Sequence, residues 1–153
     1  MRILFDGREL FVLWQGNADS SPDHCLADDS GRVLCFRDPE TARRHTPTGS
    51  KGKVYSLDLD CVAEWVDDVL LDLPASILDV WNFLEDFCRG CADKEPDERG
   101  GSTHAEVHGI LSQMALQEYL GPPEQELTPE GLDWLRRRVR ACLCFVRECI
   151  SRS

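Results

Sequence analysis

The chain has 153 residues, 42% of them hydrophobic, with four tryptophans and a formal net charge of −11 at pH 7. This length and composition predict a single globular domain over residues 1–153 and argue against a disordered chain. The negative charge disfavours binding to nucleic acid or to an anionic membrane, because both are polyanions.

The sequence predicts a cytoplasmic protein. No stretch approaches the roughly 18 apolar residues that a membrane span requires. The first ten residues lack the basic and apolar regions of a signal peptide. In the cytoplasm the eight cysteines would be reduced thiols, and several are expected to be small buried hydrophobes on helices: Cys61, Cys88, Cys142 and Cys149.

The first third of the chain predicts a small antiparallel sheet with one short helix. Residues 2–5 and 9–14 are rich in strand-forming residues, and the Asp6-Gly7 dipeptide between them is a hairpin signal. Asp38 followed by Pro39 predicts a helix start near residue 39. Shorter apolar runs add three possible strands, at residues 24–27, 32–37 and 53–57.

The centre of the chain, residues 57–88, predicts two amphipathic helices separated by Pro74, which cannot continue a helix. Apolar residues recur in each with the spacing of one buried face. We therefore expect Trp65 and Trp81 to be buried in the core. The predicted faces are Val62, Trp65, Val66, Val69 and Leu70 in the first helix and Ile77, Trp81, Leu84, Phe87 and Cys88 in the second.

The last third predicts two more helices after a polar, mobile loop near residues 90–102. Thr103 and Glu106 have the spacing of a capping box, and Thr128-Pro129 predicts the start of a final helix that ends near Ile150. The predicted fold class is therefore α+β: residues 1–57 mainly β, and residues 58–153 mainly α, in a bundle of about four helices.

Charge is unevenly distributed along the chain. Residues 57–99 hold thirteen acidic and three basic residues, a net of −10, and residues 132–153 have a net of +4. An acidic helical face suits a basic protein partner. The alternative is that these acids pair with the arginine-rich last helix and serve only stability. The residues predicted to contact the partner are Glu64, Asp67, Asp68, Asp72, Asp79, Glu85 and Asp86.

A second motif has the spacing of a zinc finger, Cys88-x2-Cys91 followed by His104-x3-His108. A finger needs apolar residues between its ligand pairs, and the intervening segment is polar, so we predict no metal. A zinc-binding or metal-dependent module using these four residues remains the alternative. No other pattern predicts a catalytic residue or a cofactor, and we expect no enzymatic activity.

The chain resembles the immunity proteins of bacterial polymorphic toxin systems. Three segments carry the resemblance: RVLCFRDPETARRH at residues 32–45, Asp58-Leu59-Asp60 leading to Trp65, and ILDVWNFLEDF at residues 77–87. The resemblance implies a non-catalytic protein that neutralises a cognate toxin domain by direct binding. Toxin nucleases are often basic, and an acidic face would complement them. A non-catalytic adaptor with another partner is the remaining alternative.

Overall fold

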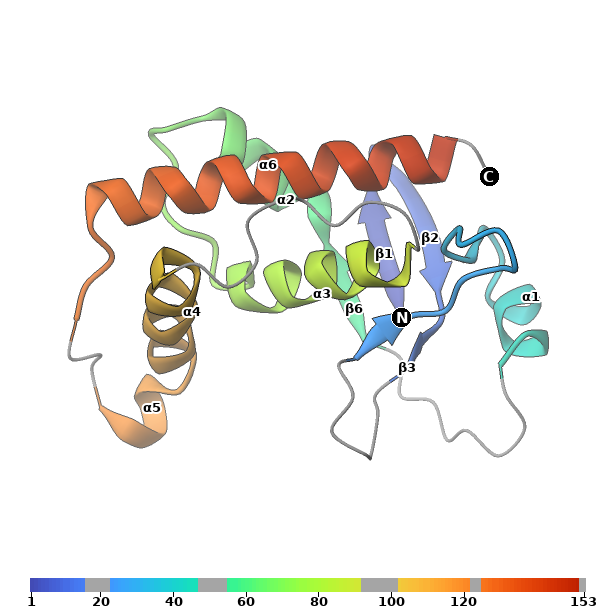
Figure 1. Cartoon of the computed structure of the whole chain (residues 1–153), viewed down its shortest axis with the longest axis horizontal. Coiled ribbons are helices and arrows are strands. Elements are labelled where there is room, and N and C mark those ends of the chain that lie inside the picture. Colours follow the sequence, from blue (N-terminus) through green and yellow to red (C-terminus); the bar gives the residue numbers. More distant parts are fainter. Residues whose placement is uncertain (16–22, 47–54, 92–101, 122–124, 152–153) are drawn as a thin grey trace.

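The computed structural model describes residues 1–15, 23–46, 55–91, 102–121 and 125–151 (Figure 1). Four of the described strands form a sheet in the order β5-β2-β1-β6, and β3 and β4 form a second, two-stranded sheet. Helices α2 to α6 follow along the chain. The predicted α+β class is confirmed, with the small sheet at the N-terminal end and the helices after it.

The hairpin of β1 (Arg2–Phe5) and β2 (Arg8–Val12) forms where the sequence predicts it. Asp6 and Gly7 both have positive φ, 50° and 65°, as the tight turn requires. The carboxylate of Asp60 accepts hydrogen bonds from the amides of Asp6, at 2.6 Å, and Gly7, at 2.9 Å. The turn is thus fastened to the start of α2 (Leu59–Asp67).

The sheet is mixed, whereas the sequence predicted an antiparallel one. β5 (Cys35–Phe36) pairs antiparallel with β2, but β6 (Ser56–Asp58) pairs with β1 in parallel. A tight turn forces its two strands to run antiparallel, and a long connection does not. β6 is reached through such a connection, which includes α1 (Pro39–Arg44). The two-stranded sheet consists of β3 (Trp14–Gln15) and β4 (His24–Cys25).

Helix α2 ends earlier than its apolar pattern predicts. Asp68 takes an extended conformation, and its carboxylate accepts a hydrogen bond from the Leu70 amide at 2.9 Å. Such a local bond competes with the helical ladder and ends it. Val69 and Leu70 were predicted to be buried, but they are 77% and 88% exposed. The buried face of α2 therefore stops at Val66.

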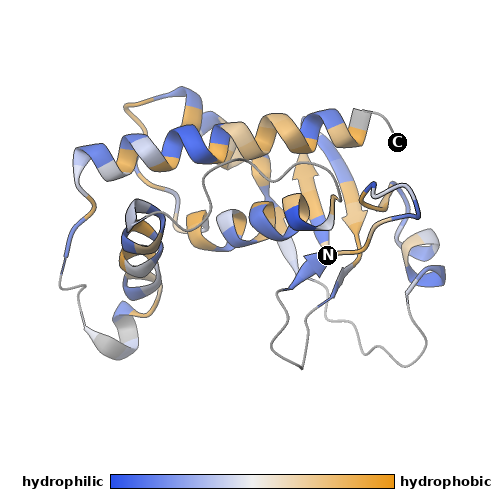
Figure 2. Ribbon diagram, viewed as in Figure 1, coloured by the Kyte–Doolittle hydropathy of each residue, from blue (hydrophilic) through white to orange (hydrophobic). Residues whose placement is uncertain are grey.

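Helix α3 (Ile77–Gly90) lies in the middle of the molecule. In Figure 1 it runs under α6 (Pro129–Ser151), with the sheet behind it and α4 (Ser102–Ala115) near its N-terminal end. In Figure 2 the hydrophobic residues, in orange, lie in β1, in the end of β2 and in the part of α6 above α3. Trp65 and Trp81 are both buried in this core, at 1% and 0% exposure, as predicted.

The helix starts follow the predicted caps with one difference. Asp38 accepts from the Thr41 amide at 2.7 Å, and Thr128 accepts from the Gly131 amide at 3.0 Å. α4 begins at Ser102, so Thr103 lies inside the helix and is not its cap. A short helix, α5 (Gln117–Leu120), follows α4. The predicted mobile loop near residues 90–102 falls mostly on residues outside the described ones.

None of the helices in the described residues combines the length and the apolar character needed to cross a membrane.

Replacing Trp65 or Trp81 by Ala should lower the free energy of unfolding by about 3–5 kcal/mol, the range for large aromatic residues in cores. Chemical denaturation measures the change. Tyr119, which is 83% exposed, supplies the matched control, because Tyr119→Ala removes an aromatic ring without emptying the core. Unchanged stability in both tryptophan variants would contradict the placement of α2 and α3.

Candidate functional site

Acidic side chains form a stripe along the exposed side of α2. Asp60, Glu64, Asp67 and Asp68 follow one another at i, i+4, i+7 and i+8, the spacing of one helical face. Together with Ala63 and Leu71 they line a shallow groove of about 630 Å³. We call this feature the acidic groove. It combines four carboxylates with two apolar side chains, a composition suited to a basic ligand that also has apolar groups.

The stripe places like charges next to each other. Carboxylates three or four residues apart on a helix repel, at a cost of roughly 0.2–0.5 kcal/mol for each pair. Among the described residues, the stripe makes one ion pair, between the Arg140 guanidinium and the Asp67 carboxylate at 3.3 Å. Both side chains of this pair are exposed, so it contributes little stability. The Glu64 carboxylate has no hydrogen bond or ion pair to another described residue. The charges of Glu64 and Asp67 therefore add little to the stability of α2, whereas the carboxylates of Asp60 and Asp68 bond backbone amides.

Two arginines of α6, Arg136 and Arg140, hold the backbone at the C-terminal end of α2. Arg136 is 7% exposed, and it donates to the carbonyls of Asp68 at 3.0 Å and Leu71 at 3.3 Å. Its guanidinium also lies over the Trp65 ring, 4.5 Å from the centroid. Arg140 donates to the Val66 carbonyl at 2.7 Å. A positive charge at a helix C-terminus is favourable, because the last carbonyls have no partners within the helix. The alternative role of the acids, pairing with the last helix, thus applies to Asp67 and to Glu85, which lies 3.6 Å from Arg138.

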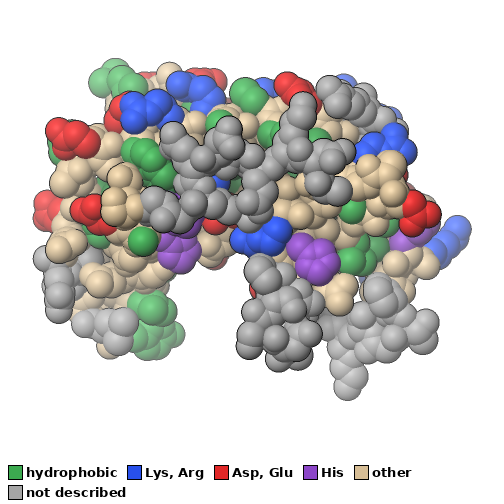
Figure 3. Space-filling view, in the orientation of Figure 1, with side chains coloured by type: hydrophobic (Ala, Val, Ile, Leu, Met, Phe, Trp, Pro, Cys, Tyr) green, Lys and Arg blue, Asp and Glu red, His purple; other side chains and the backbone are tan. Residues whose placement is uncertain are grey.

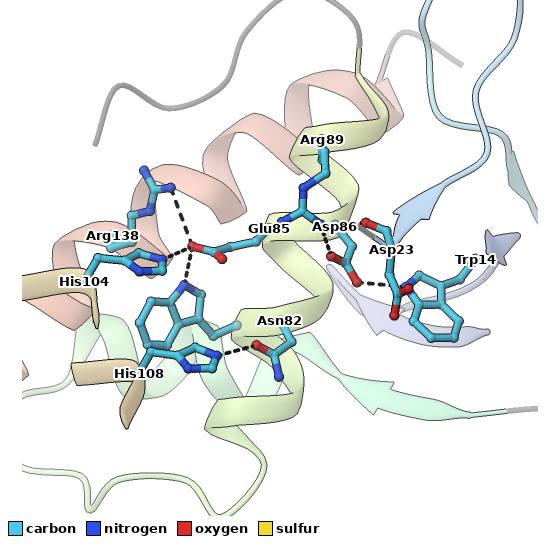
Figure 4. A network of polar contacts seen from close by, with 10 residues as sticks. Trp14, Asp23, Asn82, Glu85, Asp86, Arg89, His104, His108 and Arg138 are labelled. Atoms are coloured by element: carbon cyan, nitrogen blue, oxygen red, sulfur yellow. Dashed lines mark hydrogen bonds and ion pairs between the residues drawn. The ribbon is translucent and has the colours of Figure 1, made fainter. Parts of the chain in front are cut away.

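Glu85 lies inside the protein, and its predicted place on an outward acidic face is wrong. It is 8% exposed, because α3 is covered by the sheet on one side and by α4 and α6 on the others. Figure 4 shows its carboxylate among three cationic or donor groups. The Trp81 indole donates to it at 2.9 Å, His104 Nε2 lies at 2.8 Å, and Arg138 lies at 3.6 Å.

These neighbours keep Glu85 ionised. Burial alone would raise the pKa of its carboxyl group. The hydrogen bond and charge of His104, with smaller contributions from Trp81 and Arg138, more than offset burial, and the net pKa is lowered. Buried charges are tolerated when they are paired in this way. The group joins α3, α4 and α6, so its role in the structure is to hold these helices together.

Asp86 is also turned inward and is not a member of an exposed face. Its carboxylate accepts from the Trp14 indole at 2.8 Å and from Arg89 at 2.5 Å (Figure 4). Arg89 donates in addition to the carbonyl of Asp23 at 2.6 Å. Burial raises the pKa of Asp86 despite these two donors. The cluster connects α3 to the two-stranded sheet.

The other five predicted partner-binding residues are exposed: Glu64, Asp67, Asp68, Asp72 and Asp79. Glu64, Asp67 and Asp68 line the acidic groove. Asp72 follows its apolar end at Leu71. Asp79 lies in the first turn of α3, where the helix dipole favours a carboxylate, and it is not one of the groove-lining residues. The structure thus brings three of the seven predicted residues together in one groove.

Sequence reasoning missed Asp60 and Leu71 in the groove and the exposed Val69 and Leu70 next to it. Asp60 was left out, although its position four residues before Glu64 places it on the same helical side. The exposure of Val69, Leu70 and Leu71 was missed. Val69 and Leu70 continue the apolar spacing of α2, so they were expected to be buried. Asp68 is the signal that could have predicted their exposure, because aspartate favours turns and helix ends.

The four zinc-finger residues do not form one cluster. Cys88 and Cys91 are buried at the C-terminal end of α3, where the Cys91 sulfur lies 3.7 Å from that of Cys149. His104 contacts Glu85, and His108 Nε2 lies 3.1 Å from the Asn82 side-chain oxygen. Within the described part of the chain, no group of three or more His, Cys, Asp or Glu residues is placed to hold a metal ion.

The environments of the cysteine thiols and of the Ser112 hydroxyl indicate structural roles for most of them. Burial raises the pKa of Cys35 to about 12, and burial next to Cys149 raises that of Cys91 to about 12. Cys61, expected to be buried, is exposed. Ser112 lies 3.4 Å from His108 Nδ1, but its hydroxyl donates to the His108 carbonyl at 2.8 Å. Its single proton is thus used within the helix, as is usual for serine there.

Comparisons of this chain with protein-family models, with curated proteins and with solved structures find no match.

The Glu85 cluster predicts a specific pH dependence. Because the folded pKa of Glu85 lies below its ordinary value of 4.5, its contribution is fully present above that value and is lost as the pH falls through the folded pKa. Glu85→Gln should cost about 1–3 kcal/mol at pH 7, since it leaves Arg138 and His104 without a carboxylate. The difference from wild type should shrink below pH 4.5. Denaturation from pH 3 to 7 measures it, with the exposed Glu106→Gln as control. Equal stability of Glu85→Gln and wild type at pH 7 would contradict this role.

The separated cysteines and histidines predict that the purified protein retains less than stoichiometric zinc after dialysis. Metal analysis of wild type and of His108→Ala decides the question. His108 is the ligand candidate of choice, because it is partly exposed and its replacement leaves the core filled. One equivalent of zinc in wild type that disappears in His108→Ala would show a metal site after all.

Proposed function

We propose that this chain is a non-catalytic protein-binding module that holds a basic partner in the acidic groove, and that the partner is a toxin domain which it neutralises. The observation that supports the proposal best is the stripe of Asp60, Glu64, Asp67 and Asp68 on the exposed side of α2. Carboxylates on one side, with few compensating cations, attract a basic surface and speed its approach.

Two further points support the toxin domain as the partner. The sequence resembles the immunity proteins of bacterial toxin systems, as argued above from residues 32–45 and 77–87. The interior carboxylates of Glu85 and Asp86 have protein partners that stabilise the fold, so a structural role accounts for them. An inhibitor that acts by covering its target needs a charged, rigid surface and no chemistry of its own.

The proposal predicts that neutralising the groove slows association. The variant Glu64→Gln, Asp67→Asn, Asp72→Asn is chosen because it spares Asp60 and Asp68, whose carboxylates hold backbone amides. Association with the toxin domain encoded beside this gene should slow by roughly tenfold at low salt, because charge complementarity acts mainly on the association rate. Stopped-flow mixing or surface plasmon resonance measures the rate.

The matched control is Asp29→Asn, Glu106→Gln, Glu130→Gln, which removes the same net charge at exposed sites outside the groove. It should associate at nearly the wild-type rate. For wild type, the rate should fall as salt rises beyond about 0.15 M, where the Debye length drops below about 8 Å. If the neighbouring gene product does not bind, or if both triple variants associate equally fast, the proposal is wrong.

A further inference from the structure

Three consecutive aliphatic side chains project from the end of α2. Val69 is 77% exposed, Leu70 is 88% exposed and Leu71 is 44% exposed. We call these three residues the apolar tip. Figure 3 shows hydrophobic atoms beside carboxylates at the upper left of the molecule, where Figure 1 places the segment between α2 and α3. Single exposed aliphatic residues are common, but three in a row form a patch that calls for an explanation.

The apolar tip is held in place by specific contacts. Arg136, itself buried, donates to the carbonyls of Asp68 and Leu71, one at each end of the tip. Asp68 accepts from the Leu70 amide at 2.9 Å, and the Leu71 amide bonds the Asp68 carbonyl at 3.3 Å. A segment fixed in this way loses little conformational freedom when it is covered, so binding to it is less costly.

The tip is continuous with the acidic groove. Leu71 belongs to both, Asp68 lines the groove directly before the tip, and Ala63 extends the apolar floor along α2. Apolar side chains therefore share the groove with Glu64, Asp67 and Asp68, and Asp72 follows directly after the tip. Interfaces have this anatomy, with an apolar centre inside a polar rim. A shallow groove with an apolar floor is also how proteins receive an amphipathic helix.

We propose that the apolar tip and the groove together bind a basic amphipathic helix of the partner protein, whose aliphatic face covers Leu70 and Leu71 and whose Lys or Arg side chains reach the surrounding carboxylates. This inference rests on the proposed function and specifies the chemistry of the partner. The basic helix follows from charge complementarity: the carboxylates that flank the tip require cations on both sides of the partner's apolar face.

The same charges argue against two other occupants. A contact between two copies through a twofold axis would bring both tips and both sets of carboxylates together, which repel. An anionic membrane would be repelled by the exposed carboxylates of Asp67, Asp68 and Asp72 beside Leu70. Both occupants remain outcomes that the experiment below detects.

The test uses two 18-residue helical peptides of equal positive charge, one with Leu and one with Ala on its apolar face. Calorimetry should show that the full chain binds the Leu peptide about tenfold or more tightly than the Ala peptide, a difference of about 1.4 kcal/mol, because the leucines bury apolar surface that alanines lack. The variant Val69→Ser, Leu70→Ser should bind both peptides equally. Leu116→Ser, at a leucine that is 47% exposed on another surface, is the matched control and should keep the preference.

Amide shifts from isotope-labelled protein locate the contact and separate the outcomes. Shifts centred on residues 63–72 with the Leu peptide support the inference. Equal, salt-sensitive binding of both peptides by wild type would overturn the role of the tip while leaving the acidic groove intact. If neither peptide binds, or if shifts lie elsewhere, both proposals fail. Concentration-dependent dimerisation through the tip, or binding of Leu70 to anionic vesicles, would overturn the assignment of the occupant.

Discussion

The fold depends on the burial of α3 and on the ionised side chain, that of Glu85, which this burial places in the core. α3 has the sheet on one side and α4 and α6 on the others, so even a residue on its polar side is enclosed. Glu85 is such a residue, and an isolated carboxylate in that position would be very costly. The indole of Trp81, the imidazole of His104 and the guanidinium of Arg138 surround it and keep it ionised. Because these groups come from three helices, the charge fixes how the helices lie against each other.

The contrast between α2 and α3 connects this packing to function. Both helices carry acidic residues off their apolar stripes, but α2 is covered on one side and α3 on nearly all. The carboxylates of Glu85 and Asp86 on α3 become interior contacts, whereas Asp79 in its first turn and most acids of α2 remain surface charges. The arginines of α6 reinforce the difference, because Arg136 binds the backbone at the end of α2 and does not neutralise its stripe. What remains is a rigid, negatively charged groove next to an exposed apolar segment. The stability of the fold does not explain why these two features lie together.

The sequence predicted the α+β class, the turn at Asp6-Gly7 and the burial of Trp65 and Trp81, because each depends on local geometry or on a strong periodicity. The parallel pairing of β6 depends on a long connection that no local signal records. Helical spacing could not separate exposed Glu64 from buried Glu85, because both lie off the apolar stripe, and how many neighbours cover a helix is a tertiary property. Likewise, the spacing of Val69 and Leu70 predicted a buried face, whereas the competing carboxylate of Asp68 ends the helix before them. The function expected from the resemblance stays a prediction.

The central claim is that the carboxylates of Glu64, Asp67 and Asp72, in and beside the acidic groove, serve binding and not the fold. The free energy of unfolding of the variant Glu64→Gln, Asp67→Asn, Asp72→Asn at low salt tests it without a partner. Since this variant relieves repulsion worth roughly 0.2–0.5 kcal/mol for each like-charged pair, it should be at least as stable as wild type. A loss of more than about 1 kcal/mol, the scale of a net stabilising hydrogen bond, would show that these side chains support the fold and would contradict the account.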